Sequence, residues 1–334
     1  MTINRKLASI KTIAEINPIP GADRICHYRV DYWWVIDGVG KYKVGDKVIY
    51  CEIDSFLPVR PEYEFLRKSS HKQLTDGREG FRLRTIKLKG AISQGLLLPL
   101  TSEGVEGDDL TESLGITKWD PPVSAQLSGL VKGNFPNFFP KTDEERVQNI
   151  KLDFSKYEFQ ITEKLDGSSF SAYCLNGEYG VCSRNMELKE TEDNAYWKAS
   201  RSQNVKEKLL KYCTDHNRNI AIQGELLGPG VQGNSYKLPE FKIYFFNAYD
   251  IDKQVRFSPA ELSALIFELG LPIAPVINAR CRVPEEDSVK CLLDWANGKS
   301  MLNPETDMEG FVVRDVNGFL SFKVISNNYL MKQA

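Results

Sequence analysis

Residues 163–169, Glu-Lys-Leu-Asp-Gly-Ser-Ser, could form a reactive lysine site. Lys164 is followed by Asp166 and Gly167, and a glycine at this position allows the sharp turn that would end a strand and hold the lysine in a pocket. The amine of such a lysine can attack phosphorus only when it is neutral. Because the ordinary pKa of lysine is near 10.4, only about one molecule in a few thousand is neutral at pH 7. A reactive Lys164 therefore requires a nearby group that lowers the pKa of its amine.

A divalent cation, Mg²⁺ or Mn²⁺, is the simplest such group, since it favours the neutral amine and also offsets negative charge on a phosphate. The acids available to bind it are Asp166, Glu225 and Glu309. They are far apart in the sequence, as expected if strand ends from one sheet converge on a pocket. Glu225 and Glu309 each stand beside a glycine, so turn residues with solvated carboxylates are the alternative interpretation.

The Lys-x-Asp-Gly pattern is short, and an exposed β-turn would explain it equally well. Five further segments follow it, however, at residues 183–185, 223–228, 244–251, 309–314 and 321–326. In order and approximate spacing, the six segments resemble motifs I, Ia, III, IIIa, IV and V of the covalent nucleotidyltransferase superfamily, which contains ligases and mRNA-capping enzymes. The resemblance covers about residues 151–334.

This resemblance implies that Lys164 forms a covalent lysyl-AMP from ATP. It also implies ribose or metal contacts for Asp166, Glu225 and Glu309, and stacking of adenine on Phe246, whereas Phe245 points to the core. Lys323 would act in catalysis on the α-phosphate, and Arg184 would clamp a phosphate. The alternatives are a surface salt bridge for Arg184, a solvated strand charge for Lys323 and a core position for Phe246.

Motif V departs from the pattern of many RNA ligases, in which a second lysine follows the first two residues later. This sequence has Ile325 at that position. Either another residue, such as Lys332, supplies the missing charge, or a later reaction step relies on Lys323 alone.

The first hundred residues consist of short apolar-alternating runs separated by turn signals, which predicts a small β-barrel. Strands are expected at residues 30–36, 47–51, 81–88 and 95–100, and parts of this region resemble OB-fold modules. Residues 101–140 are predicted to connect two domains and to pack through their aromatic side chains. Helices are expected at residues 142–149, 192–212 and 258–269, the last with Ser258 as N-cap and Pro259 in its first turn.

The predicted fold class is α+β: an OB-fold β-barrel in residues 1–125, then a nucleotidyltransferase domain (ATP-grasp-like ligase) in residues 126–334, built on antiparallel sheets with flanking helices. Most DNA ligases and capping enzymes carry an OB domain after the transferase domain, whereas here the barrel comes first. That order resembles the fifth RNA ligase family, whose members seal nicks in duplexes. Arg146, Gln148 and Asn149 occupy positions at which members of that family contact the nucleotide or support one of the motifs.

The resemblance implies a monomeric enzyme that acts on nicked duplex RNA or an RNA–DNA hybrid. Residues 78–89 hold five basic residues and one acid, a pattern expected of one barrel strand with a basic face toward phosphates or with a charged, protected edge. A DNA ligase, a capping-type nucleotidyltransferase and a non-catalytic RNA-binding protein are the alternatives.

The composition is that of a soluble globular protein, with 42% hydrophobic residues, 26% charged residues and a formal net charge of −2. Any basic surface must therefore be local. The seven cysteines form no C-x-x-C pair, and no apolar run is long enough for a signal peptide or a membrane span. These features predict a cytoplasmic or nuclear protein without a membrane partner.

Overall fold

The computed structural model describes residues 5–74, 77–101, 103–120 and 129–334. The chain divides into two compact units, Met1–Pro122 with Leu330–Ala334, and Val123–Tyr329. The predicted boundary between residues 125 and 126 lies outside the described residues.

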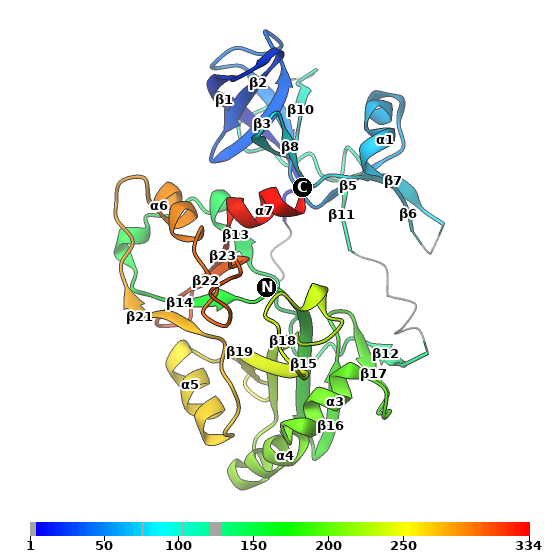
Figure 1. The fold of residues 1–334 in the computed structure, drawn as a ribbon, viewed down its shortest axis with the longest axis vertical. Coiled ribbons are helices and arrows are strands. Elements are labelled where there is room, and N and C mark those ends of the chain that lie inside the picture. The colour runs from blue at the N-terminus through cyan, green and yellow to red at the C-terminus, as the bar shows by residue number, and fades with distance from the viewer. Residues whose placement is uncertain (1–4, 75–76, 102, 121–128) are drawn as a thin grey trace. The chain divides into compact units, whose positions relative to one another are not determined.

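The first unit is built around a curled five-stranded antiparallel sheet of OB type (Figure 1). Its core holds large apolar side chains, among them Tyr28, Trp33 and Tyr50, that are almost fully buried. The strands, in the order of the sheet, are β10 (Leu96–Pro99), β4 (Lys47–Cys51), β1 (Ala8–Ile19), β2 (Ala22–Val30) and β3 (Trp33–Gly38).

Two of the predicted strands are interrupted. The run at 30–36 contains the β2–β3 turn, where Asp31 has a left-handed backbone with φ of 47°. The run at 81–88 belongs to two strands of different sheets, so residues 78–89 do not form one basic strand. Alternation of apolar residues continues across a tight turn, and therefore it did not reveal either break.

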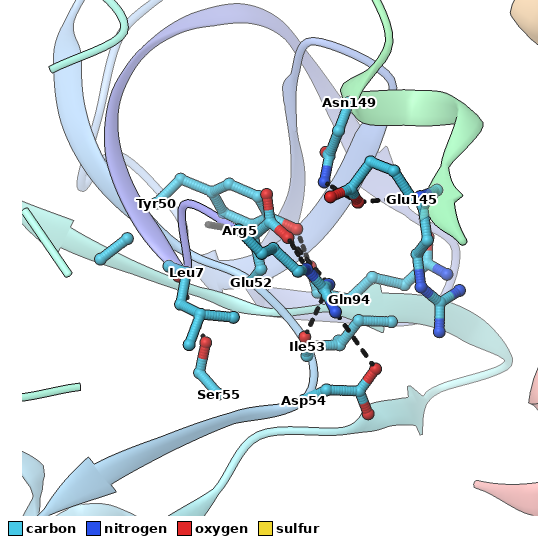
Figure 2. Close-up of polar contacts among 12 residues, drawn as sticks. Arg5, Leu7, Tyr50, Glu52, Ile53, Asp54, Ser55, Gln94, Glu145 and Asn149 are labelled. Carbon is cyan, nitrogen blue, oxygen red and sulfur yellow. Dashed lines mark hydrogen bonds and ion pairs between the residues drawn. The ribbon is translucent and has the colours of Figure 1, made fainter. Parts of the chain in front are cut away.

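Beside the curled sheet lie a four-stranded sheet, a two-stranded hairpin and two short helices. They comprise β11 (Thr117–Lys118), β5 (Ser55–Pro58), β7 (Glu79–Arg82), β6 (His71–Gln73), β8 (Thr85–Leu88), β9 (Ala91–Gln94), η1 (Pro61–Leu66) and α1 (Arg67–Ser70). Figure 2 shows how Arg5 ties this region together, with Nε donating to Glu52 at 3.0 Å and Nη2 donating to the Ile53 carbonyl at 3.2 Å. Glu52 is buried, and pairing with Arg5 offsets the loss of its hydration.

The second unit contains a seven-stranded antiparallel sheet with helices against one face (Figure 1). Its strands, in order, are β12 (Val131–Asn134), β17 (Met186–Leu188), β16 (Glu178–Cys182), β15 (Ser168–Leu175), β18 (Ile220–Leu227), β19 (Lys242–Asp250) and β20 (Val255–Arg256). The helices are α3 (Ala195–Ser202), α4 (Val205–His216) and α5 (Pro259–Glu268), and η4 (Gln232–Asn234) follows β18.

A five-stranded sheet completes the second unit. It contains β13 (Glu145–Arg146), β23 (Ser321–Ile325), β22 (Gly310–Asp315), β14 (Phe159–Lys164) and β21 (Val276–Cys281), in that order. Only the β13–β23 pair is parallel among these. The second unit also contains η2 (Val147–Asn149), η3 (Phe154–Lys156) and α6 (Ser288–Trp295). The last helix, α7 (Asn327–Gln333), begins in this unit and continues past its boundary at Tyr329.

The helix expected at 258–269 is confirmed, with a complete capping box between Ser258 and Glu261. The stretch at 192–212 forms two helices, because Asn204 adopts a left-handed backbone between them. The helix expected at 142–149 is wrong. Residues 145–146 pair with β23 and are followed by a single 3₁₀ turn, so tertiary strand pairing overrides the local helix signal.

The aromatic residues of the connecting segment pack as expected, with Phe135, Phe138 and Phe139 forming a cluster with Tyr173. The seven cysteines are all free thiols. No helix in the described part of the chain is both long and apolar enough to cross a membrane.

Candidate active site

Lys164 is the last residue of β14, which lies between β22 and the edge strand β21 in the five-stranded sheet. It pairs with Gly310, the first residue of β22, so the preceding residue, Glu309, reaches the same sheet end. Gly310 has a φ of +149°, and a Cβ atom there would lie 2.0 Å from the Val324 carbonyl oxygen. Only glycine therefore permits this approach of β22 to β23.

The loop after Lys164 brings the neighbouring sheet to the lysine. The Gly167 amide donates to Oε1 of Glu225 at 3.1 Å, and a Cβ on Gly167 would lie 2.4 Å from the Leu226 carbonyl oxygen. Glu225 lies within β18 and pairs with Ser169 and Tyr244, which rejects the interpretation of Glu225 as a turn residue. The Lys-x-Asp-Gly segment is thus a junction between two sheets.

The Lys164 amine donates to Oε2 of Glu309 at 2.7 Å. Burial opposes a charge on the amine, but the carboxylates of Glu309, Glu225 and Asp166 outweigh burial and raise the pKa of Lys164 above its ordinary value. Burial also raises the pKa of Glu225 to about 8 and the pKa of Glu309 in the same direction. The protein groups therefore favour a charged lysine, and a cation beside the carboxylates would act in the opposite sense.

Asp166 is held by two tyrosines that the sequence did not single out for this role. Its backbone N–H donates to the Tyr236 hydroxyl at 2.7 Å, and its Oδ2 accepts from the Tyr329 hydroxyl at 2.6 Å. Burial raises the pKa of both phenols, so they remain protonated. Spacing along the chain carried no signal for these pairs, because Tyr329 is 163 residues from Asp166.

The three carboxylates suit a hard divalent cation. Asp166, Glu225 and Glu309 all lie near the Lys164 amine, and burial opposes the ionised forms of Glu225 and Glu309. Across the residues that the structure describes, no three His, Cys, Asp or Glu side chains are close enough together to hold a metal ion by themselves. This arrangement fits Mg²⁺ or Mn²⁺ bound through one or two carboxylates, water and substrate phosphates.

Lys323 and Arg184, the two expected phosphate contacts, share one partner. Asp143 lies 3.5 Å from the Lys323 amine and 3.9 Å from a guanidinium nitrogen of Arg184. Lys323 is on β23, whereas Arg184 is in the β16–β17 turn, so Asp143 bridges the two sheets. The Arg184 and Asp143 side chains are 51% and 43% exposed, and the pair is therefore weak and open to displacement.

Phe245 and Phe246 face opposite sides of β19. Phe245 is fully buried in the core beneath the helices. Phe246 is the extra residue of a bulge against β18, and it is half-buried beside Leu165 and Tyr236. The guanidinium of buried Arg314 lies 6.0 Å from the Phe246 ring centroid. Phe246 therefore lies on the face of the seven-stranded sheet away from the helices, beside the residue that follows Lys164.

Glu144, the residue after Asp143, forms a second bridge between the sheets. Its Oε1 lies 3.3 Å from Arg256 of β20 and 3.6 Å from Arg314 of β22. Burial lowers the pKa of Arg314 from its ordinary value. Asp143 and Glu144 lie in the stretch that was expected to be a helix, and no pattern in the sequence indicates a bridge between two sheets.

Arg146, Gln148 and Asn149 follow directly. Arg146 is buried and pairs with Lys323 across β13 and β23, while Asn149 donates to Glu145 at 3.0 Å (Figure 2). Gln148 is 3% exposed, and its Oε1 receives no hydrogen bond from any residue that the structure describes. A buried acceptor without a donor is expected to serve a ligand or water.

At the departure in motif V, Ile325 is buried and pairs with Gly310. Its apolar side chain contributes to packing rather than to charge. Lys332, the suggested substitute, belongs to the other compact unit.

Comparisons with known proteins agree with this arrangement. An OB-fold domain family model matches residues 7–100, and an RNA ligase family model matches residues 157–331. No curated protein sequence matches the chain. Among solved structures, a lysine mutant of Naegleria gruberi RNA ligase with AMP and Mn is 40% identical, covers 99% of both chains and has a TM-score of 0.86. The Naegleria gruberi RNA ligase with PPi is 41% identical, covers 98% of both chains and has a TM-score of 0.84.

An OB domain followed by antiparallel sheets that bring one lysine among carboxylates defines a protein of the nucleotidyltransferase superfamily. Within that superfamily, the chain belongs to the RNA ligase family.

Proposed function

We propose that this chain is an ATP-dependent RNA ligase that seals nicks between a 3′-OH and a 5′-phosphate in duplex RNA or an RNA–DNA hybrid, with Lys164 as its nucleophile. The hydrogen bond of the Lys164 amine to Glu309, at the junction that also carries Glu225 and Asp166, is the observation on which the proposal depends. Structures of the Naegleria gruberi enzyme with ATP and Mn, with AMP and Mn, and with PPi support ATP as the substrate of this chain and a divalent metal as its cofactor.

The Naegleria gruberi structures also include mutants of a lysine, an aspartate, two glutamates and a second lysine, in that chain order. Residues of the same types occur here in the same order. They are Lys164, Asp166, Glu225, Glu309 and Lys323. This agreement supports their assignment to the active site.

The reaction consists of three displacements at phosphorus. First, Lys164 loses a proton, its nitrogen bonds to the α-phosphorus of ATP, and pyrophosphate leaves. Next, an oxygen of the 5′-phosphate bonds to the adenylate phosphorus, the nitrogen–phosphorus bond breaks, and the amine recovers its proton. Finally, the 3′ oxygen bonds to the 5′ phosphorus, its proton passes to solvent, and AMP leaves.

The proposed site residues other than Lys164 act through position or charge. Lys323 and Arg184 hold the reacting phosphates once Asp143 is displaced, and Phe246 stacks on adenine. Arg146, Gln148 and Asn149 contact the nucleotide, for which the lone acceptor of Gln148 is the supporting observation. Asp166, Glu225 and Glu309 would hold Mg²⁺ or Mn²⁺, which offsets phosphate charge and lowers the pKa of Lys164 when bound.

The OB domain, residues 1–125, binds the nucleic acid, and residues 126–334 catalyse the reaction. Arg84, Lys87 and Lys89 are exposed in and around the β8–β9 hairpin and suit contacts to phosphates. The enzyme acts as a monomer in the cytoplasm or nucleus, where its seven thiols remain reduced.

Incubation with ATP labelled at the α-phosphate and Mg²⁺ should attach the label covalently, and Lys164→Ala should abolish labelling. Lys211→Ala, which removes an exposed lysine of α4, is the matched control and should label normally. A wild-type protein that takes up no label from either ATP or GTP would overturn the enzyme assignment and leave a binding protein.

Sealing should then be compared on nicked duplexes with every combination of RNA and DNA strands. A ribose 3′-OH at the nick should be strongly preferred over a deoxyribose 3′-OH. Equal sealing of both would identify a DNA ligase, and labelling by GTP alone would identify a capping-type enzyme.

A further inference from the structure

Asp166 is fixed at two points by phenols from remote parts of the chain. Tyr236, in the segment after η4, accepts a hydrogen bond from the Asp166 backbone N–H at 2.7 Å. Tyr329, in α7, donates to Oδ2 of the Asp166 carboxylate at 2.6 Å. One contact sets the backbone at residue 166 and the other sets the plane of its carboxylate.

Tyr329 is itself held firmly by the junction between β23 and α7. Its backbone N–H donates to the Ser326 hydroxyl at 3.1 Å, and that hydroxyl donates to Oδ1 of Asn297 at 3.0 Å. Ser326 is fully buried, and its own N–H donates to the Glu309 carbonyl at 2.9 Å. Ser326 and Tyr329 therefore connect the backbone of Glu309 to the carboxylate of Asp166 through three hydrogen bonds.

The partner of the Tyr329 hydroxyl is informative. A phenol placed only for packing can satisfy its hydrogen bond with a backbone carbonyl, as the buried Tyr28 and Tyr50 do in the first unit, whereas Tyr329 is half-buried. Tyr329 instead binds a carboxylate two residues from Lys164, whose charge contributes to the environment of that amine. Hydrogen bonds of this kind restrict how a carboxylate can turn toward a cation or a ribose hydroxyl.

We propose that Tyr329 is a positioning residue for lysine adenylylation, acting through Asp166. This inference rests on the proposed function of Lys164 as the nucleophile. By occupying Oδ2, Tyr329 leaves Oδ1 as the oxygen of Asp166 that would contact ATP or its metal ion. Because α7 begins directly after β23, the hydrogen bond between Tyr329 and Asp166 also connects the strand of Lys323 to the loop of Asp166.

Tyr329→Phe removes only the hydroxyl and tests this inference. We expect adduct formation to slow about 10-fold to 100-fold, with a matching rise in the Mg²⁺ or Mn²⁺ concentration needed for half-maximal labelling. Tyr249→Phe is the matched control, since the Tyr249 hydroxyl reaches Gln254 at 3.3 Å rather than any residue of the site. It should label at the wild-type rate at every metal concentration.

A readout independent of turnover is the rise in Tm caused by Mn²⁺ together with an ATP analogue whose α–β bridge cannot be cleaved. This rise should be smaller for Tyr329→Phe than for wild type and Tyr249→Phe. If Tyr329→Phe matches wild type in labelling rate, metal dependence and Tm rise, the inference is wrong, although the ligase assignment stands as long as the wild type is labelled.

A double-mutant cycle with Asp166→Asn covers the case in which Tyr329→Phe is less stable by itself. If Tyr329 acts through Asp166, the double mutant should label no more slowly than Asp166→Asn alone. Rate losses that multiply in the double mutant would show that the two side chains act independently and would overturn the inference.

Discussion

The Lys164 amine and the Glu309 carboxylate are hydrogen-bonded at 2.7 Å although 145 residues separate them in the sequence. Pairing of β14 with β22 delivers Glu309 to the end of the lysine strand. The contact raises the pKa of Lys164, so it holds the amine in place in a charged form that cannot attack phosphorus.

The rate of adduct formation should increase with pH, because the neighbouring carboxylates favour the charged form of Lys164 and the amine attacks only after it has lost its proton. In Glu309→Gln, the carboxylate with the largest raising effect is absent, so the pKa of Lys164 should fall. The rising part of the pH–rate profile should therefore move to lower pH, even though loss of a metal contact reduces the maximal rate. Initial labelling rates across pH measure this shift. A profile that stays in place or moves to higher pH would contradict the assignment.

Asp143→Asn should strengthen binding of nicked RNA with a 5′-phosphate, since the Asp143 carboxylate competes with phosphate for Lys323 and Arg184. Both ion pairs are long, at 3.5 and 3.9 Å, and at least partly exposed. We therefore expect the Kd to fall only about two- to fivefold. Binding of a nick with a 5′-hydroxyl should change less. Asp193→Asn, which neutralises a fully exposed acid, controls for net charge. Weaker binding by Asp143→Asn alone would mean that the acid organises the clamp.

The adjacent phenylalanines of β19 should separate stability from nucleotide binding. Phe245→Ala leaves a cavity in the core and should reduce the free energy of unfolding by about 3–5 kcal/mol. Phe246→Ala should cost less stability but raise the KM for ATP about tenfold, the equivalent of about 1.4 kcal/mol of lost stacking. Denaturant unfolding and labelling at varied ATP concentrations check the two effects. An unchanged KM in Phe246→Ala would assign the adenine platform elsewhere.

Gly310→Ala should destabilise the protein by about 1–3 kcal/mol and slow labelling. The added Cβ would meet the Val324 carbonyl oxygen at 2.0 Å, and the φ of +149° is strained for alanine. Gly133→Ala is the matched control, because no heavy atom lies within 4 Å of its added Cβ. Its unfolding free energy should change by no more than about 0.5 kcal/mol. Equal Tm values for the two variants would contradict the packing argument.

Local signals in the sequence predicted much of the fold. The helix capped by Ser258 is confirmed because its capping box and first-turn proline lie within four consecutive residues. The α+β class and the OB-type barrel are also confirmed, since short alternating runs and turn residues are local features. The helix expected at 142–149 is wrong, because pairing of β13 with β23 involves residues far away in the sequence.

The sequence by itself determined the order of the motifs, the lysine that we propose as the nucleophile and the family to which the chain belongs. These are properties of residue type and spacing. Only the tertiary structure decided that Glu309 is the partner of Lys164, that Asp143 lies between Lys323 and Arg184, and that Tyr329 holds Asp166. The physical reason is that sheet order and strand register bring distant parts of the chain together, and a one-residue change of register would turn Lys164 or Lys323 to the opposite face of the sheet.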